Sequence, residues 1–370
     1  MEKKLPNNII IIGGGIVGAS FAYHAHLFGI DNITIVTDSL PGDKEQATSN
    51  TWGWGNGYAT NDKKYADFRL ANLQYWKKLI KEIDNLKPTS KGAFFWDMSE
   101  SELHKTVEQH KNWGHAVKKF TKLEIDKHLP KVSSRPKIAG FGESDLAIEG
   151  SKATLELIKA SGAEIKKDNV QKLIYENNHV RGVKTKNRII FADEVIITAG
   201  LGTSDLLSSI NINFKMRSSL GLLAYTNLLP PLLNYPITGI NFHARQNYEG
   251  RLVIGGTFDE DASKENNIRK AAEKLVEDMA LRLKYNDHMT LDYFTLGERP
   301  ITIDGRPKIG RINNQMGKVI KGVYVAVMHS GITNAPLAGK LGIAEIIDGK
   351  RNFLLSDFLP QKITDNKGYH

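Results

Sequence analysis

The sequence predicts an α/β protein in which a nucleotide-binding part is interleaved with a part built on an antiparallel sheet. Residues 8–38 show the first feature, a short apolar run, three glycines, a helix-like segment and a β-branched run within about thirty residues. The second feature begins after Lys215, where three β-rich segments separated by turns follow one another: SSLGLLAYTN, ITGINFHARQN and EGRLVIGGTFD. A chain of 370 residues can bury a large core, and two domains are expected.

The glycines after the first apolar run occupy the GxGxxG positions of a dinucleotide-binding turn. The first permits a tight turn, the second lets the backbone approach a pyrophosphate, and the third lets helix and strand pack closely. Asp38 stands one residue beyond the usual acidic position, which Thr37 occupies, and we expect it to contact the ribose. The alternative is a buried strand–turn–helix without a ligand. The predicted nucleotide contacts of this unit are Gly13, Gly15, Ile16, Val17, Gly18 and Asp38.

The composition excludes several classes of function. The absence of cysteine rules out disulfides, thiolate metal sites, cysteine nucleophiles and a cysteinyl cofactor link, and we expect no metal. The net charge of +9 comes from scattered lysines without an arginine-rich run, which argues against nucleic acid. A solvated surface, an anionic substrate and weak membrane-surface contact all remain open. The apolar run near the N-terminus is too short for a signal peptide or a membrane span, so a cytoplasmic location is predicted.

Further along the chain, the segment 47–60 (ATSNTWGWGNGYAT) can lie along a cofactor or form an ordinary surface loop. A long amphipathic helix should begin at Asp62, and Ser99 with Glu102 forms a capping-box pattern. We predict further helices over 151–161 and 261–285, and a buried strand over 194–198. The segment 297–312 is expected to be turn-rich. Last comes a strand over 322–329 and a helix from Ser330 to Ile347, closed by Gly349.

Taken in order, six blocks resemble the D-amino acid oxidase-like family of FAD-dependent oxidoreductases, of the glycine oxidase, sarcosine oxidase and D-amino acid dehydrogenase type. The blocks are IIIIGGGIVGAS, ATSNTWGWGNG, HVRGVKTKNRIIFADEVIITAG, EGRLVIGGT, GERPITIDGRPKIG and GVYVAVMHSGITNAPLAGKLGIAEII. The resemblance implies a Rossmann-type FAD-binding domain from residues 1–75, 145–215 and 296–360. Residues 76–144 and 216–295 would form the substrate domain, and 361–370 a polar tail.

The resemblance also implies roles for individual residues. The segment around Ser49, Asn50 and Thr51 would contact the cofactor's phosphate and ribitol region, and Val170 the adenine. The nucleotide and the flavin ring would be lined by Ala199, Gly200, Gly331, Ile332 and Thr333. A helix beginning at the flavin would stabilise the negative charge that the reduced ring carries near N1.

The substrate side of the predicted site centres on Arg299 in GERPITIDG, which the resemblance implies binds the substrate carboxylate. A guanidinium suits this task because its planar fork donates two parallel hydrogen bonds. The alternative is a structural pair with Glu298 or Asp304. His329 and His243 are candidates for orienting the amine, and Tyr235 and Phe242 for walls of the pocket.

The predicted function is oxidation of the CH–NH bond of a small amino or imino acid, with FAD held non-covalently because Gly53 stands where some relatives carry an attachment histidine. A dehydrogenase is slightly preferred, since Leu252 and Val253 replace the lysine that sarcosine oxidase-like enzymes place near oxygen. The electron acceptor is a quinone, an electron-transfer protein or oxygen. The alternatives are oxidation of a 2-hydroxy acid or glycerol 3-phosphate, and a flavoprotein subunit that acts only with a partner chain, which an exposed Trp54 would suit.

Overall fold

A parallel sheet forms the centre of the nucleotide-binding part in this computed structural model, which describes residues 5–256, 265–283, 285 and 288–361. Its strand order is β17-β18-β11-β1-β2-β7, and only β17 runs antiparallel to its neighbour. The strands are β1 (Ile9–Ile12), β2 (Ile33–Thr37), β7 (Glu164–Lys167), β11 (Glu194–Ile197), β17 (Lys308–Gly310) and β18 (Val323–Val327).

Both faces of this sheet are covered, which explains its continuous apolar strands. On one face, Ile9 and Ile11 pack in a core with the helices α1 (Ile16–Leu27), α5 (Gly150–Ser161) and α8 (Gly331–Asp348). On the other face, Ile10 and Ile12 pack in a core with α6 (Thr203–Ser208) and a three-stranded sheet. That small sheet consists of β8 (Val170–Glu176), β9 (His179–Thr185) and β10 (Ile189–Phe191).

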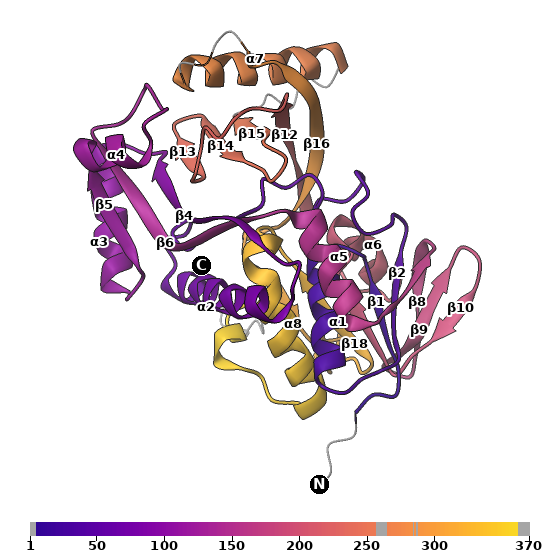
Figure 1. Ribbon diagram of the computed structural model, residues 1–370. Coiled ribbons are helices and arrows are strands. Elements are labelled where there is room, and N and C mark those ends of the chain that lie inside the picture. Colours follow the sequence, from indigo (N-terminus) through magenta and orange to yellow (C-terminus); the bar gives the residue numbers. More distant parts are fainter. Residues whose placement is uncertain (1–4, 257–264, 284, 286–287, 362–370) are drawn as a thin grey trace, which may run out of the picture.

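A second large sheet carries the other part of the molecule (Figure 1). Its strands are β3 (Trp54–Gly55), β4 (Pro88–Trp96), β5 (Val117–Thr121), β6 (Ile138–Ile148), β12 (Met216–Thr226), β13 (Ile237–Gly239), β14 (Phe242–Gln246), β15 (Leu252–Gly256) and β16 (Leu291–Thr302). All pairs are antiparallel except β13 with β4, so the sheet is mixed where a purely antiparallel one was predicted. The helix α7 (Glu265–Leu283) covers the outer face of this sheet.

The predicted helices form with their expected signals. The helix α2 (Lys63–Glu82) begins at Asp62, whose side chain accepts a hydrogen bond from Tyr65 N. Ser99 and Glu102 form the predicted capping box of α3 (Glu100–Asn112), and a second capping box begins α4 (Lys122–His128). Of the predicted helix 261–285, residues 261–264 and 284 lie outside the described residues.

The prediction for residues 297–312 is partly wrong. Residues 297–302 continue the long strand β16, which pairs with β12 along its length, and the turn is confined to the residues before β17. The segment Gly-Glu-Arg-Pro contains two turn-forming residue types, but Pro300 stands on the edge strand of the sheet, where a missing N–H is tolerated.

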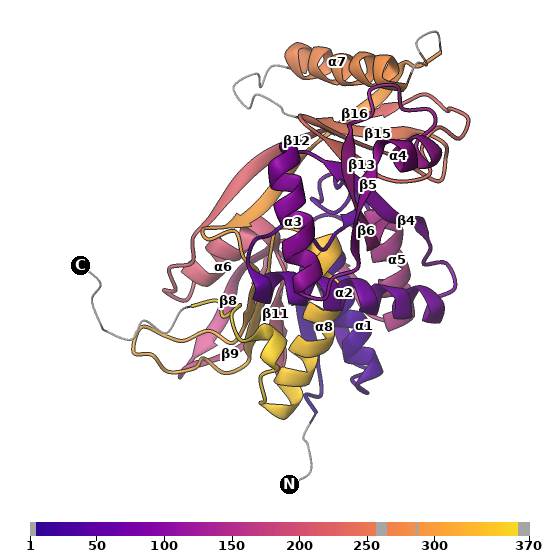
Figure 2. The ribbon, with the colours of Figure 1, turned by 90° about the vertical axis from the view of Figure 1, so that its left-hand side faces the viewer.

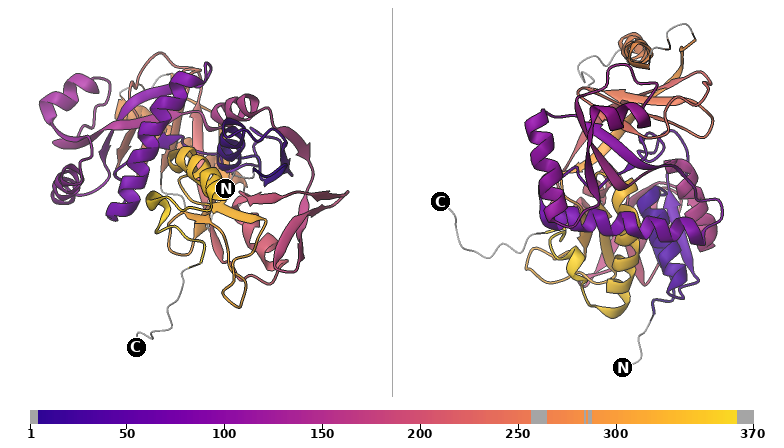
Figure 3. Two further views of the ribbon diagram at one scale, coloured as in Figure 1. Left: turned by 90° about the horizontal axis from the view of Figure 1, so that it is seen from below. Right: turned by 60° about the vertical axis from the view of Figure 1, so that its left-hand side comes forward.

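The helix α2 connects the two parts by crossing α8, as Figures 2 and 3 show from two further sides. Trp76 Nε1 donates to Ile332 O at 2.7 Å, and Leu337 N donates to Asn72 Oδ1 at 2.8 Å. These bonds fix the beginning of α8 between the two sheets. Of the described residues, no helix is long and apolar enough to cross a membrane.

Candidate active site

The glycine turn between β1 and α1 has the close contacts that the motif predicts. Gly13 has φ +107°, and a Cβ there would lie 2.6 Å from Thr198 O. A Cβ on Gly18 would lie 2.1 Å from Gly13 O, so only glycine lets α1 pack this closely on the turn. Thr198, which the sequence analysis did not select, donates from Oγ1 to Ile12 O and secures the turn to β11.

Two helices begin side by side at the carboxyl ends of these strands. Gly15, the N-cap of α1, and Ser330, the N-cap of α8, both lack a side-chain cap, and neither first turn contains an acidic residue. A Cβ on Gly331 would lie 3.4 Å from the Ile16 side chain, so the two termini adjoin (Figure 1). Each helix N-terminus carries partial positive charge, and together they favour an anionic group between them.

The loop after β2 lies against the beginning of α1. Thr48 Oγ1 accepts a hydrogen bond from Ile16 N at 3.1 Å, a contact that the sequence analysis missed because one more hydroxyl in a threonine-rich loop gives no signal. Ser151 Oγ donates to Ser49 Oγ at 3.0 Å, and Thr51 Oγ1 accepts from Gly53 N at 3.2 Å. Asp38 is exposed directly after β2, at the expected edge of the sheet.

The remaining predicted cofactor residues lie along the same edge. Ala199 and Gly200 follow β11 directly, beside the turn at Gly13. Val170 begins β8 and belongs to the core on that face of the sheet. Ile332 and Thr333 lie in the first turn of α8, where Thr333 Oγ1 accepts from Asn56 N at 3.4 Å. The structure therefore brings the predicted cofactor residues to the ends of β1, β2, β11 and β18.

The register of the second large sheet defines an inner face, turned toward α8 and the nucleotide-binding part. Residues paired across neighbouring strands share one face. The row Thr295, Leu223, Gly255, His243, Thr238 and Phe95 is continuous across six strands. Arg299, Arg245 and Tyr225 lie on the same face by alternation, whereas Phe294, Ala224, Ile254 and Ala244 face α7.

Arg299 lies where this inner face meets the cofactor edge. A Cβ on Gly221 of the neighbouring strand would lie 2.3 Å from Arg299 Nη2, so the guanidinium extends across that glycine. Two residues earlier, Gly297 packs against Asn50, and Pro300 approaches Gly200. These contacts place the predicted carboxylate-binding residue next to two predicted cofactor segments.

Both predicted histidines lie near Arg299 and are uncharged. Burial and the charge of Arg299 lower the pKa of His243 to about 3, and the ring packs on Trp52 with centroids 4.4 Å apart. His329, which follows the end of β18, is exposed to solvent by its accessible surface area. Desolvation by the surrounding protein, followed by the charges of Arg299 and Arg69, lowers its pKa to about 4. The structure thus groups one cation with two neutral imidazoles, which can accept a hydrogen bond from an amine.

Tyr235 and Phe242 are not part of this group. Tyr235 packs among Phe94, Phe141 and His128, on the face of β4 opposite Phe95. Phe242 likewise belongs to the core beneath α7, because it precedes His243 and therefore points to the other face. The face on which each of these side chains lies depends on the strand register, which the sequence alone does not determine.

A buried ion pair behind Trp52 was not predicted. Arg245 is 2% exposed and binds Glu149 through both carboxylate oxygens, at 2.6 and 3.2 Å, and also donates to Trp52 O. Trp52 packs with Leu223, Tyr225 and Val253 on the inner face, while its indole nitrogen is buried without a hydrogen-bond partner. A buried donor of this kind can be satisfied by an acceptor atom of a bound ligand. Trp54, expected to be exposed, is half-buried against Tyr58.

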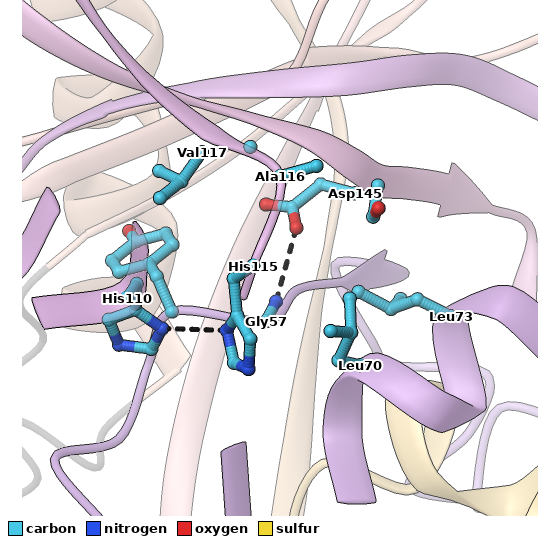
Figure 4. Close-up of a pocket in the computed structure, with 11 residues that line it drawn as sticks. Gly57, Leu70, Leu73, His110, His115, Ala116, Val117 and Asp145 are labelled. Carbon is cyan, nitrogen blue, oxygen red and sulfur yellow. Dashed lines mark hydrogen bonds between the residues drawn. The ribbon is translucent and has the colours of Figure 1, made fainter. Parts of the chain in front are cut away.

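A small cavity is lined by residues that include Gly57, His110, His115 and Asp145, and Arg299 is not among its lining residues (Figure 4). Asp145 Oδ1 accepts from Gly57 N at 3.1 Å on its wall, and His110 Nδ1 lies 2.9 Å from His115 Nδ1. Burial raises the pKa of Asp145 to about 7, an effect that the hydrogen bond from Gly57 and the charge of Arg69 oppose. Burial is also the first cause that lowers the pKa of His110, to about 4.

The comparisons with known proteins agree with this geometry. The family model described as "FAD dependent oxidoreductase" matches residues 8–344. The chain belongs to this family.

Individual relatives are distant but aligned over almost the whole chain. The uncharacterized oxidoreductase YurR of Bacillus subtilis (strain 168) is 26% identical, over 95% of this chain and 98% of that protein. The glycine oxidase of the same organism is 24% identical, over 92% and 93%. The crystal structure of L-proline dehydrogenase from P. horikoshii superposes with a TM-score of 0.83 at 20% identity, over 96% and 98%. The fold and the family predicted from the sequence are confirmed.

The cofactor of this family is FAD, and the residues present fit it. The glycine turn admits close backbone approach, and two helix N-termini without acidic residues face the ends of the parallel strands. The Trp52 indole nitrogen has no hydrogen-bond partner in the protein, and Gly255 and Gly221 stand on the inner face of the large sheet. These features accommodate an anionic dinucleotide with a flat ring beside α8.

Proposed function

We propose that this FAD-dependent oxidoreductase oxidises the CH–NH bond of a small amino or imino acid. The observation that supports this most directly is that Arg299 stands on the strand that touches the cofactor segments at Asn50 and Gly200, and that its charge helps to lower the pKa of both His243 and His329. When bound, the flavin supplies the chemistry by accepting a hydride from the substrate's α-carbon. The work of the protein is to bind, orient and desolvate the substrate.

Arg299 is proposed to bind the substrate carboxylate. A carboxylate that leaves water for a protein interior needs a fixed cation, and a guanidinium can bind it with two parallel hydrogen bonds. Arg299 stands on the inner face of the large sheet, which is turned toward α8. A substrate carboxylate bound to it would place the α-carbon between the sheet and the beginning of that helix. Positioning of this kind accounts for a large part of many enzymes' rate enhancement.

His243 and His329 are proposed to orient the amine. Because desolvation and the charge of Arg299 lower the pKa of both, each imidazole is neutral near pH 7 and keeps one ring nitrogen without a proton. A neutral imidazole can accept an N–H from the substrate without repelling it. The neighbouring guanidinium also favours an uncharged amine, the form from which a hydride can leave.

The contacts of Gly53 support non-covalent FAD. Gly53 has φ +76°, and a Cβ would lie 2.2 Å from Ile148 O, so no side chain fits there to form a covalent link. The preference for a dehydrogenase is also a proposal. The strand β15 brings Val253 and Gly255 to the inner face. Neither residue carries the positive charge that would assist electron transfer to oxygen.

The substrate class is tested by anaerobic bleaching of the flavin. Holoenzyme is mixed with glycine, proline, N-methylglycine, D- and L-alanine, lactate, glycolate and glycerol 3-phosphate, and the absorbance of the flavin is followed. Bleaching by one or more amino or imino acids, with slow or no response to the hydroxy acids, supports the proposal. Faster bleaching by lactate, glycolate or glycerol 3-phosphate would replace it with the hydroxy-compound alternative.

A further inference from the structure

Arg69 is a buried cation without a carboxylate partner among the described residues. It is 2% exposed, on the side of α2 that faces α8. Its Nε donates to Asn56 O at 3.0 Å, its Nη2 to Asn56 Oδ1 at 2.5 Å and its Nη1 to Tyr65 Oη at 3.2 Å. All three acceptors are neutral, so these hydrogen bonds satisfy donors but leave the charge uncompensated.

The other well-buried arginine of the described chain shows what this protein usually does with such a charge. Arg245 is equally buried, and it binds both oxygens of Glu149. Arg311 and Arg351, which are less buried, pair with Glu194 and Glu345. Taking a cation out of water without an anion is costly, so the exception at Arg69 calls for an anion from outside the chain.

The acidic group within the field of Arg69 does not fill this role at neutral pH. Arg69 lowers the pKa of Asp145, but burial dominates and holds that pKa at about 7, so a large fraction of Asp145 stays protonated. The remaining groups that Arg69 acts on, His110 and His329, are pushed further toward the uncharged form. No charged group of this set therefore neutralises the guanidinium.

The contacts of Arg69 lead to the beginning of α8. Its acceptor Asn56 donates from the backbone to Thr333 Oγ1 at 3.4 Å. Its other acceptor, Tyr65 Oη, also accepts from Asn334 Nδ2 at 3.1 Å. Arg69 is thus linked through Asn56 and Tyr65 to the first turn of α8, which carries partial positive charge of its own.

We propose that Arg69 is a positioning residue that supplies a fixed positive charge to the pyrimidine end of the flavin and stabilises its reduced, anionic form. The inference rests on the proposed site, in which the flavin ring lies beside Gly331, Ile332 and Thr333. Arg69 and the α8 N-terminus then act together on the flavin, a role distinct from the carboxylate binding proposed for Arg299.

The test measures two properties of the bound flavin that need no substrate: the midpoint potential and the affinity for sulfite, whose adduct places negative charge on the same part of the ring. The central variant is Asn56→Asp, which keeps the acceptor that Arg69 and Ala59 use and gives the guanidinium a carboxylate. We expect sulfite binding to weaken about tenfold or more and the potential to fall by about 30 mV, the two-electron equivalent of tenfold. Stability should be kept or raised.

Three further variants separate charge from packing. Arg69→Met should repeat the loss of sulfite affinity and potential, whereas Arg69→Lys should retain most of both. Tyr65→Phe removes the acceptor of two hydrogen bonds, from Arg69 and Asn334, but no charge, and it should leave both properties near those of the wild type. If Arg69→Met does not fold, Asn56→Asp still decides the question.

Two results would overturn the proposal. One is unchanged potential and sulfite affinity in Asn56→Asp with altered thermal stability, which would make Arg69 a structural residue. The other is an unchanged potential and sulfite affinity together with an altered KM for substrates that carry a second carboxylate. That result would mean that the Arg69 guanidinium binds the substrate instead of stabilising the flavin. Failure to retain FAD in the wild type, or to oxidise any amino acid, is read separately and bears on the proposed function instead.

Discussion

The free energy of unfolding of Asp145→Asn, measured relative to the wild type at the same pH, should be higher at pH 8 than at pH 5. Burial raises the pKa of this carboxyl from 3.8 to about 7, so the folded protein holds a proton that the unfolded chain releases above its ordinary pKa. The stability that this proton brings is complete below about pH 4 and is lost as the pH rises through 7. Asparagine keeps the shape of the side chain and does not titrate.

The magnitude follows from the width of this pH range. One pH unit between the two pKa values changes the free energy of unfolding by about 1.4 kcal/mol. Between pH 5 and the folded pKa the wild type should therefore lose up to about 3 kcal/mol that the variant does not lose. His110 and His115 line the same cavity, and burial lowers the pKa of both, which acts in the opposite direction. They are common to both proteins and cancel in the comparison.

The assay is reversible urea unfolding of wild-type and Asp145→Asn holoenzyme at pH 5, 6, 7 and 8, with the difference in free energy plotted against pH. We expect a difference that grows in favour of the variant as the pH rises. A flat difference, or a variant that becomes relatively less stable at pH 8, would show that Asp145 is ionised in the folded protein and paired within its cavity.

Three further predictions concern the cofactor. Gly18→Ala should lower FAD affinity at least tenfold, because its Cβ would lie 2.1 Å from Gly13 O; Gly202→Ala, with the nearest atom at 3.9 Å, is the matched control for equilibrium dialysis. Acid precipitation should release yellow flavin into the supernatant, and flavin retained on the pellet would contradict non-covalent binding. Turnover with an artificial dye or quinone should exceed turnover with oxygen, and equal rates would make the enzyme an oxidase.

The sequence predicted those parts of the molecule that depend on local pattern. The glycine turn needs its residue types at fixed spacing, and the structure shows the steric contacts that Gly13 and Gly18 avoid. The capping box at Ser99 and the left-handed Gly349 that ends α8 are equally local signals. Such features can be recognised without knowing what the segment packs against.

Contacts between distant segments could not be predicted in this way. Nothing in the sequence distinguishes Arg69 from Arg245, yet Arg245 binds Glu149 whereas Arg69 donates to neutral acceptors. Tyr235 stands near His243 in the chain but packs on the opposite face of the sheet, which only the strand register decides. The strand at residues 297–302 was mistaken for a turn because its pairing with β12 outweighs its Gly and Pro content.

The central claim, that Arg299 binds the carboxylate of an amino or imino acid, is tested most directly by the KM of Arg299 variants. Arg299→Ala should keep its FAD content and raise the KM for the best amino acid substrate steeply, by the equivalent of about 2–5 kcal/mol. Arg299→Lys should also be impaired because it lacks the bidentate fork. An amine without a carboxylate should lose much less in either variant. If Arg299→Ala instead loses FAD or stability while its folded fraction shows a normal KM, Arg299 is structural and the proposed substrate class is wrong.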